Sequence, residues 1–198
     1  MNIVQFGCND AVDELYEYVK LNSNLIDNLV LVDANNFALH KAVLRYNQII
    51  DKSKLLVYFN ALVCNEDQTI ANFYIPNKDK NSGHSSLFKD LVAINWGEDL
   101  MEVKVPCISP NKILDKIPFK IDQLHIDVEG LDADIILYLD LQKYDIPYVL
   151  FESAHSDSYF NKGIKYKKCV EKLIALGYKL FDHTNRLDTV AIKNDYKA

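Results

Sequence analysis

The sequence predicts a three-layer α/β sandwich in a single domain. Short apolar runs alternate with segments of helical period over the first sixty residues, which is the β-α-β-α-β order of a parallel sheet. These runs are apolar almost without interruption, as is typical of strands that helices cover on both faces. A chain of 198 residues is long enough to bury the core of one such domain.

The N-terminal third supplies three strands and two helices. Residues 10–21 have a rough helical period with acidic residues early, and Asn35-Asn36 offers a helix cap before the apolar positions of residues 37–49. We expect strands at residues 2–6, 29–33 and 55–59.

The middle of the chain departs from this alternation. Residues 62–75 predict a hairpin or a strand extension with its turn at residues 65–68. Residues 76–99 are polar and contain Pro and Gly, which predicts a long loop. We therefore expect an insertion or lid at about residues 76–110 of the domain, which spans residues 1–198.

The remainder returns to strands and helices. Residues 102–105 alternate as a strand does, and Ser109-Pro110 is typical of a helix start. Gly177 is placed to end a helix of residues 162–176. We further expect strands at residues 123–128 and 147–152, a helix at residues 133–139, and an antiparallel hairpin of residues 178–181 and 187–192.

The stretch from Gln123 to Gly130 carries the strongest signal for a site. Its apolar positions 124, 126 and 128 alternate with His125, Asp127 and Glu129, so the strand has an apolar face and an ionisable one. Two carboxyls and an imidazole are costly to bury unless something pairs with them or uses them. The stretch is therefore either an edge strand with one wet face or part of a functional site.

Charge and cysteine content exclude several classes of protein. The net charge of −6 argues against non-specific nucleic-acid binding and against a basic membrane face. The four cysteines are scattered without a CxxC pair, which favours reduced thiols and a cytoplasmic location. The sequence has no signal-peptide pattern and no apolar run of transmembrane length, so we expect a soluble domain.

Polar residues follow five of the predicted strands. In open α/β sheets, ligands bind beyond the carboxyl ends of the strands. One such residue alone is usually a helix cap or a solvated turn, but five in one chain favour a binding site. They are Gly7 to Asp10, Asp33, Asn60, Asp127 to Glu129, and Glu152.

The residue types at these ends favour one cofactor. The segment Gly7-Cys8-Asn9-Asp10 is a poor dinucleotide fingerprint, because Asn9 and Val12 stand where glycines are required. Asp10 would repel phosphate but suits an ammonium group, and Asp33 has the position that holds ribose hydroxyls. A ribose without a phosphate chain, next to a cationic amino-acid end, describes S-adenosylmethionine.

The ordered motifs resemble those of FkbM-type methyltransferases, which are class I S-adenosylmethionine-dependent enzymes. The motifs are Gly7-Cys8-Asn9-Asp10, Leu31-Val32-Asp33, Asn60-Ala61-Leu62-Val63, Ser85-Ser86-Leu87 and Ile126-Asp127-Val128-Glu129-Gly130. The resemblance implies a Rossmann-like, mostly parallel seven-stranded sheet that ends in the hairpin. It also implies O-methylation of a sugar, glycan or related hydroxyl. Its cofactor-binding residues would be Gly7, Asn9, Asp10, Asp33, Asn60, Ala61 and Asp127.

The chain departs from the family pattern at three positions. Ala11 stands where the family usually has Gly, His125 where it usually has Lys, and Asp33 where it more often has Glu. Ala11 is small enough for cofactor binding, and Asp33 is a shorter acid that can still reach a ribose. His125 is the change that we expect to alter chemistry or substrate.

Methyl transfer to a hydroxyl predicts a general base beside the reacting atoms. Asp127 is the first candidate, followed by His125 and His155, and crowding by Glu129 and Glu152 would raise the pKa of Asp127. Alternatively, Glu129 binds backbone amides at a helix start and His125 is a core histidine. We expect His84, Ser85, Glu129 and Glu152 to contact the acceptor.

The sequence is also compatible with a metal site, with an acidic acceptor and with two other functions. Asp127, Glu152 and His155 could hold a hard divalent cation, although no ligand spacing requires one and we predict no metal. Five lysines between Lys162 and Lys172 predict a solvated helix face or, alternatively, an acidic acceptor. The competing functions are a catalytically silent cofactor-binding domain and a nicotinamide-dependent oxidoreductase.

Overall fold

The main sheet of the computed structural model has seven strands, all of which correspond to predicted apolar runs or to the predicted hairpin. The structure describes residues 1–51, 54–64, 70–157, 160–183, 187–194 and 196. The strands are β1 (Asn2–Phe6), β2 (Asn28–Asp33), β3 (Leu55–Asn60), β7 (Gln123–Ile126), β8 (Tyr148–Glu152), β9 (Tyr178–Asp182) and β10 (Asp188–Lys193). Their order is β3-β2-β1-β7-β8-β10-β9, with β10 antiparallel to both β8 and β9. The predicted sheet and its closing hairpin are therefore confirmed.

Strand β7 lies at the centre of this sheet. It pairs in parallel with β1 on one side, where Gln5 is opposite His125, and with β8 on the other, where Leu150 is opposite His125. The edge-strand interpretation is therefore wrong, and the ionisable side chains of this stretch belong to a central strand and to the turn that follows it.

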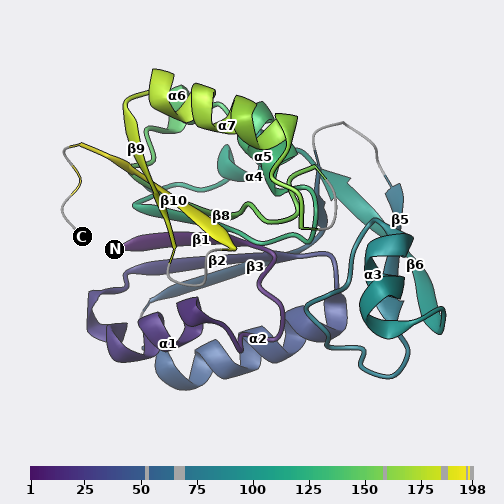
Figure 1. Ribbon diagram of the computed structural model, residues 1–198. Helices are drawn as coiled ribbons and strands as arrows, with labels where there is room; N and C mark the ends of the chain where they lie inside the picture. Colours follow the sequence, from purple (N-terminus) through teal and green to yellow (C-terminus); the bar gives the residue numbers. More distant parts are fainter. Residues whose placement is uncertain (52–53, 65–69, 158–159, 184–186, 195, 197–198) are drawn as a thin grey trace.

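Helices cover both faces of the sheet. Figure 1 shows α1 (Glu14–Leu21) and α2 (Asn36–Ile49) on one face, and α4 (Pro110–Leu114), α5 (Asp132–Tyr138), α6 (Leu141–Tyr144) and α7 (Ile164–Ala175) on the other. Helix α1 begins later than the sequence predicts, because the Asp13 side chain caps it by accepting the amide of Tyr16. Of the predicted pair Asn35-Asn36, it is Asn35 that caps α2, by accepting the amides of Phe37 and Ala38.

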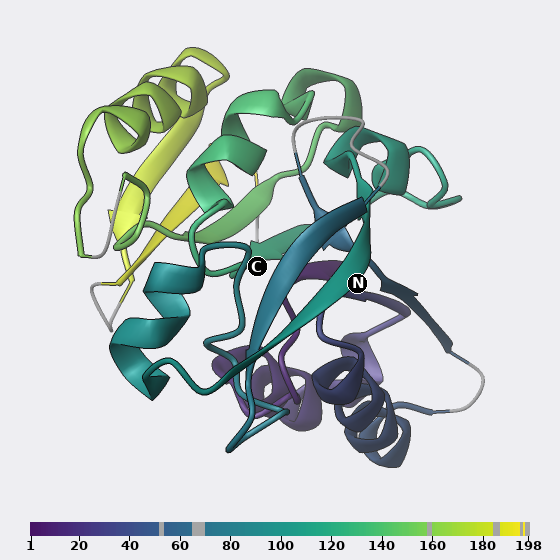
Figure 2. The same cartoon turned by 90° about the vertical axis from the view of Figure 1, so that its right-hand side faces the viewer.

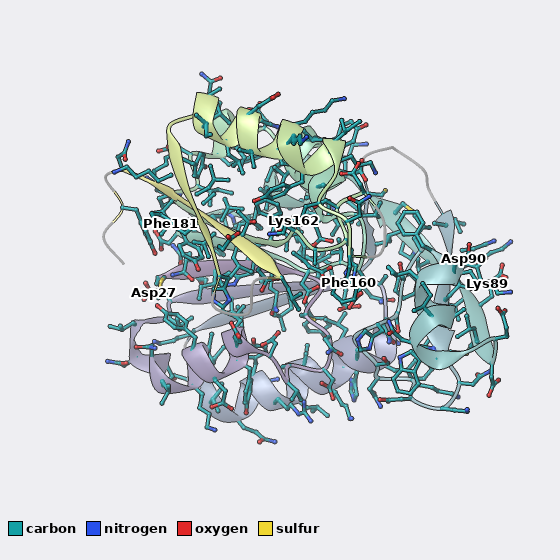
Figure 3. All side chains as sticks on the ribbon, in the orientation of Figure 1. Asp27, Lys89, Asp90, Phe160, Lys162 and Phe181 are labelled. Atoms are coloured by element: carbon teal, nitrogen blue, oxygen red, sulfur yellow. The ribbon has the colours of Figure 1, made fainter. Side chains whose placement is uncertain are left out.

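The core consists of two apolar layers that follow the alternation of the strands. Val4 and Phe6 of β1 point into the layer below α5 and α7, whereas Ile3 points into the layer that α1 and α2 close. Figure 3 shows side chains filling both spaces, with the exposed Lys89 and Asp90 projecting outward. Both faces of the parallel strands are thus buried near β1, which explains why apolar residues occupy successive positions in these strands.

A second, three-stranded sheet lies beside the carboxyl ends of the main strands (Figure 2). It contains β4 (Leu62–Val63), β5 (Ile70–Pro76) and β6 (Leu100–Ile108), in the order β4-β6-β5. The hairpin interpretation is wrong, because β6 lies between the other two strands; the predicted turn at 65–68 is outside the described residues. The predicted long loop contains a further helix, α3 (Lys89–Trp96).

Lys172 of α7 stabilises the C-terminal end of α5. Its ammonium group donates to the carbonyl oxygens of Ile136, Leu137 and Leu139 at 2.9, 2.8 and 2.7 Å. A cation at this end also interacts favourably with the helix dipole. The lysine cluster is thus divided, because Lys165 forms an ion pair with Asp134 while Lys167 and Lys168 are exposed.

We expect Lys172→Met to lower the free energy of unfolding by about 2 kcal/mol. Met keeps the apolar stem of the side chain but leaves the three carbonyl groups without their charged donor. Urea titration would measure the change, with Lys168→Met on the exposed side of α7 as the control, expected within about 0.5 kcal/mol of the wild type. Equal effects of the two substitutions would contradict this role for Lys172.

None of the helices in the described ranges is both long and apolar enough to cross a membrane.

Candidate functional site

A pocket with a volume of about 190 Å³ lies at the carboxyl ends of β1, β2, β3 and β7. The Ser82–Ser85 segment closes one side of it, and apolar side chains, including Leu62 and Phe73, form part of its wall. Eight of the predicted site residues line it, namely Gly7, Asn9, Asp33, Ala61, His84, Ser85, Asp127 and Glu129. These residues come from five separate segments of the sequence, so the fold assembles a single site from them.

Gly7 allows the turns after β1 and β7 to touch. Its φ is +77°, and a Cβ atom there would lie 1.6 Å from the carbonyl oxygen of Asp127. The Gly7 amide donates to the carbonyl of Val32 at 2.8 Å, and the Asp127 amide donates to that of Phe6 at 2.8 Å. Only glycine fits here, and the close approach fixes where Asp127 leaves its strand.

Asp33 is a buried carboxylate at the end of β2. Its Oδ2 accepts the amide of Asn9 at 2.9 Å and its Oδ1 accepts that of Asn35 at 2.7 Å. Burial raises the pKa of Asp33 to about 6, and these backbone donors limit the rise. Each carboxylate oxygen has a second lone pair, so Asp33 can still accept hydrogen bonds from a ligand.

The turn after β1 points Asn9, and not Asp10, into the pocket. Asn9 has a φ of +47° and Ala11 a φ of +55°, so the chain reverses within three residues. The Oδ1 atom of Asn9 is buried and has no hydrogen-bond partner among the described residues. Asp10 instead lies 3.3 Å from the Lys41 ammonium and 3.2 Å from the Arg45 guanidinium of α2. The structure therefore does not bring Asp10 to the pocket.

The departure at Ala11 has a physical cost in this turn. A glycine at that position would adopt the positive φ without strain, whereas the Cβ atom of Ala11 costs roughly 1 kcal/mol there. Ala11 is buried beneath the turn and does not line the pocket.

Asn60 supports the pocket from behind. Its Nδ2 donates to the carbonyls of Asp33 and Ala34 at 3.0 and 3.1 Å, and the amide of Ala61 also donates to Asp33. It thereby joins the ends of β2 and β3 without lining the cavity.

Hydrogen bonds hold the segment before α3 across the pocket. The Nδ2 of Asn35 donates to the Lys80 carbonyl at 2.9 Å and to the Ser85 hydroxyl at 3.1 Å. The Ser86 hydroxyl donates to the Glu129 carbonyl at 2.8 Å. This segment therefore connects the start of α2 with the turn after β7, and it places the exposed His84 at the rim.

Four carboxyl groups crowd together beyond β7 and β8. Burial and then Asp127 raise the pKa of Glu129 to about 9 and that of Glu152 to about 8. Burial and then Glu152 raise the pKa of Asp132 to about 8. The pKa of Asp127 is also well above its usual value, because of burial and then of repulsion by Asp132. Its side chain is exposed, so the repulsion between carboxylates is the more important of the two causes.

Asp132 was absent from the sequence-based site residues. It accepts the amides of Val128 at 3.1 Å and Gly130 at 3.2 Å, and so it holds the turn that carries Glu129 in its left-handed conformation with a φ of +56°. The sequence feature that could have identified Asp132 is its position in the first turn of a helix that follows a charged strand end.

The two histidines predicted beside Asp127 lie in different places. His155 Nδ1 is 2.8 Å from Glu152 Oε1, and burial lowers the pKa of His155. His125 lies on the sheet face towards α1, where it lines a second cavity of about 600 Å³. Burial lowers the pKa of His125 to about 4, and its Nε2 lies 3.1 Å from Gln123 Oε1. Asp127 lines both cavities.

The fold is similar to those of three solved methyltransferase structures. Methyltransferase FkbM from Methylobacillus flagellatus KT superposes with a TM-score of 0.57 at 12% identity, over 96% of this chain and 43% of that one. TrmK of M. capricolum, in complex with S-adenosyl-homocysteine, gives a TM-score of 0.47 at 14% identity, over 100% of this chain and 64% of that one. The O-methyltransferase TomG from Streptomyces achromogenes, in complex with SAM, gives 0.46 at 11%, over 97% and 72%.

This chain spans less than half the length of the Methylobacillus protein. No curated protein matches it significantly in sequence. The family described as the methyltransferase FkbM domain matches residues 2–188, which is nearly the whole chain. The chain therefore belongs to the FkbM methyltransferase family.

Proposed function

We propose that this protein is an S-adenosylmethionine-dependent O-methyltransferase that acts on a hydroxyl of a sugar, glycan or related small molecule. The observation that carries the proposal is the convergence of Asp33, Asn9 and Asp127 on one pocket. When bound, the cofactor supplies an electrophilic methyl group on a sulfonium sulfur. The protein has to hold the cofactor, position the acceptor and take up its proton.

The donor and acceptor groups of the pocket fit this cofactor. The free lone pairs of Asp33 would accept the ribose hydroxyls, and the unpaired Oδ1 of Asn9 would accept from the ammonium group. The apolar wall around Leu62 and Phe73 suits an adenine ring. The volume of about 190 Å³ is below the roughly 300–1,000 Å³ of typical ligand pockets, so binding requires the Ser82–Ser85 segment to move outward.

Asp127 is placed to act as the general base. Its carboxyl is exposed at the point where the two cavities meet, and the Gly7 contact fixes its backbone. Glu129, His84 and Ser85 add hydrogen-bonding groups around the same opening, as the recognition of a polyhydroxylated acceptor requires. The exposed rim formed by the segment before α3 is the part of the lid that would contact the acceptor.

We expect Asp33→Asn to weaken S-adenosylhomocysteine binding by about 10- to 100-fold, the loss typical of a hydrogen bond to a charged group. Since the pKa of Asp33 is about 6, the carboxylate form predominates above that pH. Wild-type affinity should therefore fall by up to about tenfold per pH unit below pH 6. Calorimetry between pH 5 and 8 would measure both effects.

Two controls test whether Asp33 itself causes these effects. The fall in affinity below pH 6 should be lost in Asp33→Asn, and the adjacent Cys8 thiol, whose pKa burial raises well above normal, stays neutral in this range. Asp10→Asn changes a nearby acid outside the pocket and should leave affinity unchanged. If the wild-type protein bound no S-adenosylhomocysteine at any pH, the proposed function would be refuted.

A further inference from the structure

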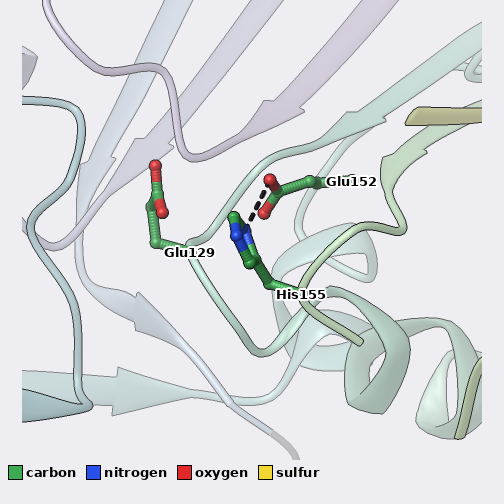
Figure 4. A group of neighbouring side chains, drawn as sticks. All are labelled: Glu129, Glu152 and His155. Atoms are coloured by element: carbon green, nitrogen blue, oxygen red, sulfur yellow. Dashed lines mark ion pairs between the residues drawn. The ribbon is translucent and has the colours of Figure 1, made fainter. Parts of the chain in front are cut away.

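We propose that Glu129, Glu152 and His155 bind a divalent transition-metal cation at the carboxyl ends of β7 and β8. Each of the three side chains offers one ligand atom, and these atoms all lie within 4.8 Å of one another. Figure 4 shows Glu152 and His155 paired, with Glu129 beside them on the turn after β7. Nothing in the family assignment or the proposed cofactor site requires this cluster.

The spacing is close to that of a coordination sphere. A cation with ligands at about 2.1 Å separates neighbouring ligand atoms by about 3 Å and opposite ones by about 4.2 Å. None of the observed separations is more than 4.8 Å, so small side-chain rotations can bring the three atoms to these values. His155 Nδ1 and Glu152 Oε1, which lie 2.8 Å apart, are already close to the shorter separation.

Glu152 carries an independent sign of a missing ligand. The residue is only 8% exposed, and its Oε2 is buried without a hydrogen-bond partner in the described part of the chain. A buried carboxylate oxygen left unpaired is costly, and buried charges in proteins are normally paired or coordinate metals. A cation between Glu152, Glu129 and His155 would satisfy that oxygen.

The neighbouring carboxyl groups also favour the binding of a cation. Asp127, Asp132 and Glu152 form a second close group, so four carboxyls share this end of the sheet. No ion pair joins any of the four to a lysine or arginine within the described ranges. Asp132 accepts two backbone amides of the turn, so we regard it as a positioning residue and not as a ligand.

The donor set indicates the class of metal. Two carboxylates with one imidazole suit Mn²⁺ or Zn²⁺ better than Ca²⁺, which prefers six to eight oxygen ligands. Three protein ligands leave coordination positions open for water or for an acceptor hydroxyl. If the proposed function holds, the cation binds the acceptor hydroxyl next to Asp127 and lowers the pKa of that hydroxyl. The metal site itself does not depend on that role.

Mn²⁺ is the probe for this site. The full chain, stripped with EDTA and free of cofactor, would be titrated with Mn²⁺ while electron paramagnetic resonance measures the free ion. We expect one saturable site per chain, weakened at least tenfold by Glu152→Gln and by Glu129→Gln. Equimolar Ca²⁺ should not displace the bound Mn²⁺. The control is Glu98→Gln, which removes an exposed carboxyl paired with Lys89 and should bind as the wild type does.

Circular dichroism would establish that each variant is folded, and the two ligand variants come from different elements, so a folding failure of one leaves the other informative. Absence of saturable Mn²⁺ binding, or binding that neither Glu152→Gln nor Glu129→Gln weakens, would overturn the proposal. S-adenosylhomocysteine binding is measured separately on the same protein. Cofactor binding without Mn²⁺ binding refutes the metal site alone, and the reverse result refutes the methyltransferase proposal alone.

Discussion

Replacing Asp127 with Asn is expected to lower methyl-transfer turnover by about 100-fold or more while leaving S-adenosylhomocysteine affinity nearly unchanged. Asn is similar in size, and the backbone that Gly7 contacts stays in place, so the pocket should keep its shape. The amide cannot take up a proton from the acceptor hydroxyl, so the methyl-transfer step loses its general base while cofactor binding is unaffected. The measurement is the rate of S-adenosylhomocysteine formation with a hydroxyl acceptor under single-turnover conditions.

The matched control is Asp182→Asn, which changes an exposed acid of β9 outside both cavities. It should leave turnover within about twofold of the wild type. If Asp127→Asn retained full turnover, the base would have to be another group beside the opening, such as Glu129. A parallel loss of cofactor affinity would instead assign Asp127 to cofactor binding.

We expect Gly7→Ala to lower the free energy of unfolding by about 3 kcal/mol or more, which is about 6 to 12 °C in melting temperature. The new Cβ would lie 1.6 Å from the Asp127 carbonyl oxygen, so the turns after β1 and β7 must separate. Because both turns line the pocket, cofactor affinity should fall as well.

Gly97 provides a matched comparison for this substitution. It has a φ of +75°, almost the same as Gly7, but a Cβ there would meet no atom within 4 Å. Gly97→Ala should therefore cost only the strain of its own backbone conformation, with φ +75° and ψ −169°, which is roughly 1–3 kcal/mol. Thermal unfolding of both variants isolates the steric contribution of the contact, and equal losses would show that the contact has no special importance.

The main sheet could be predicted because each parallel strand records its burial in its own sequence. Ile3 and Val4 are both fully buried although they point to opposite faces, so β1 carries apolar residues on both of its faces. The strand pairing of the small sheet could not be predicted in this way, because it joins residues that are distant in the sequence: Leu62 lies opposite Cys107, and Ile70 opposite Pro106. Helix α3 also escaped prediction, since Val92 is its only fully buried residue.

The pocket residues were predictable by type, but their orientation was not. Asp33 follows an apolar strand directly, so its position was determined by strand geometry alone. Asn9 and Asp10 differ by one residue, and which of them faces the pocket depends on the positive φ values of Asn9 and Ala11. Ala11 is not a residue type from which a left-handed turn is expected, so the sequence did not reveal that Asp10 would turn towards Lys41 and Arg45.

The central position of β7 has a consequence for how the chain folds during synthesis. Its partner β1 occupies residues 2–6, so the pair Ile3 and Gln123 closes across most of the chain. At about 5–20 residues per second, the free edge of β1 waits roughly 6 to 24 s for β7 to emerge from the ribosome. Non-local pairing of this kind also slows folding of the released chain. Until β7 arrives, β1 presents an unpaired apolar edge, so the first half of the protein depends on the second for protection against aggregation.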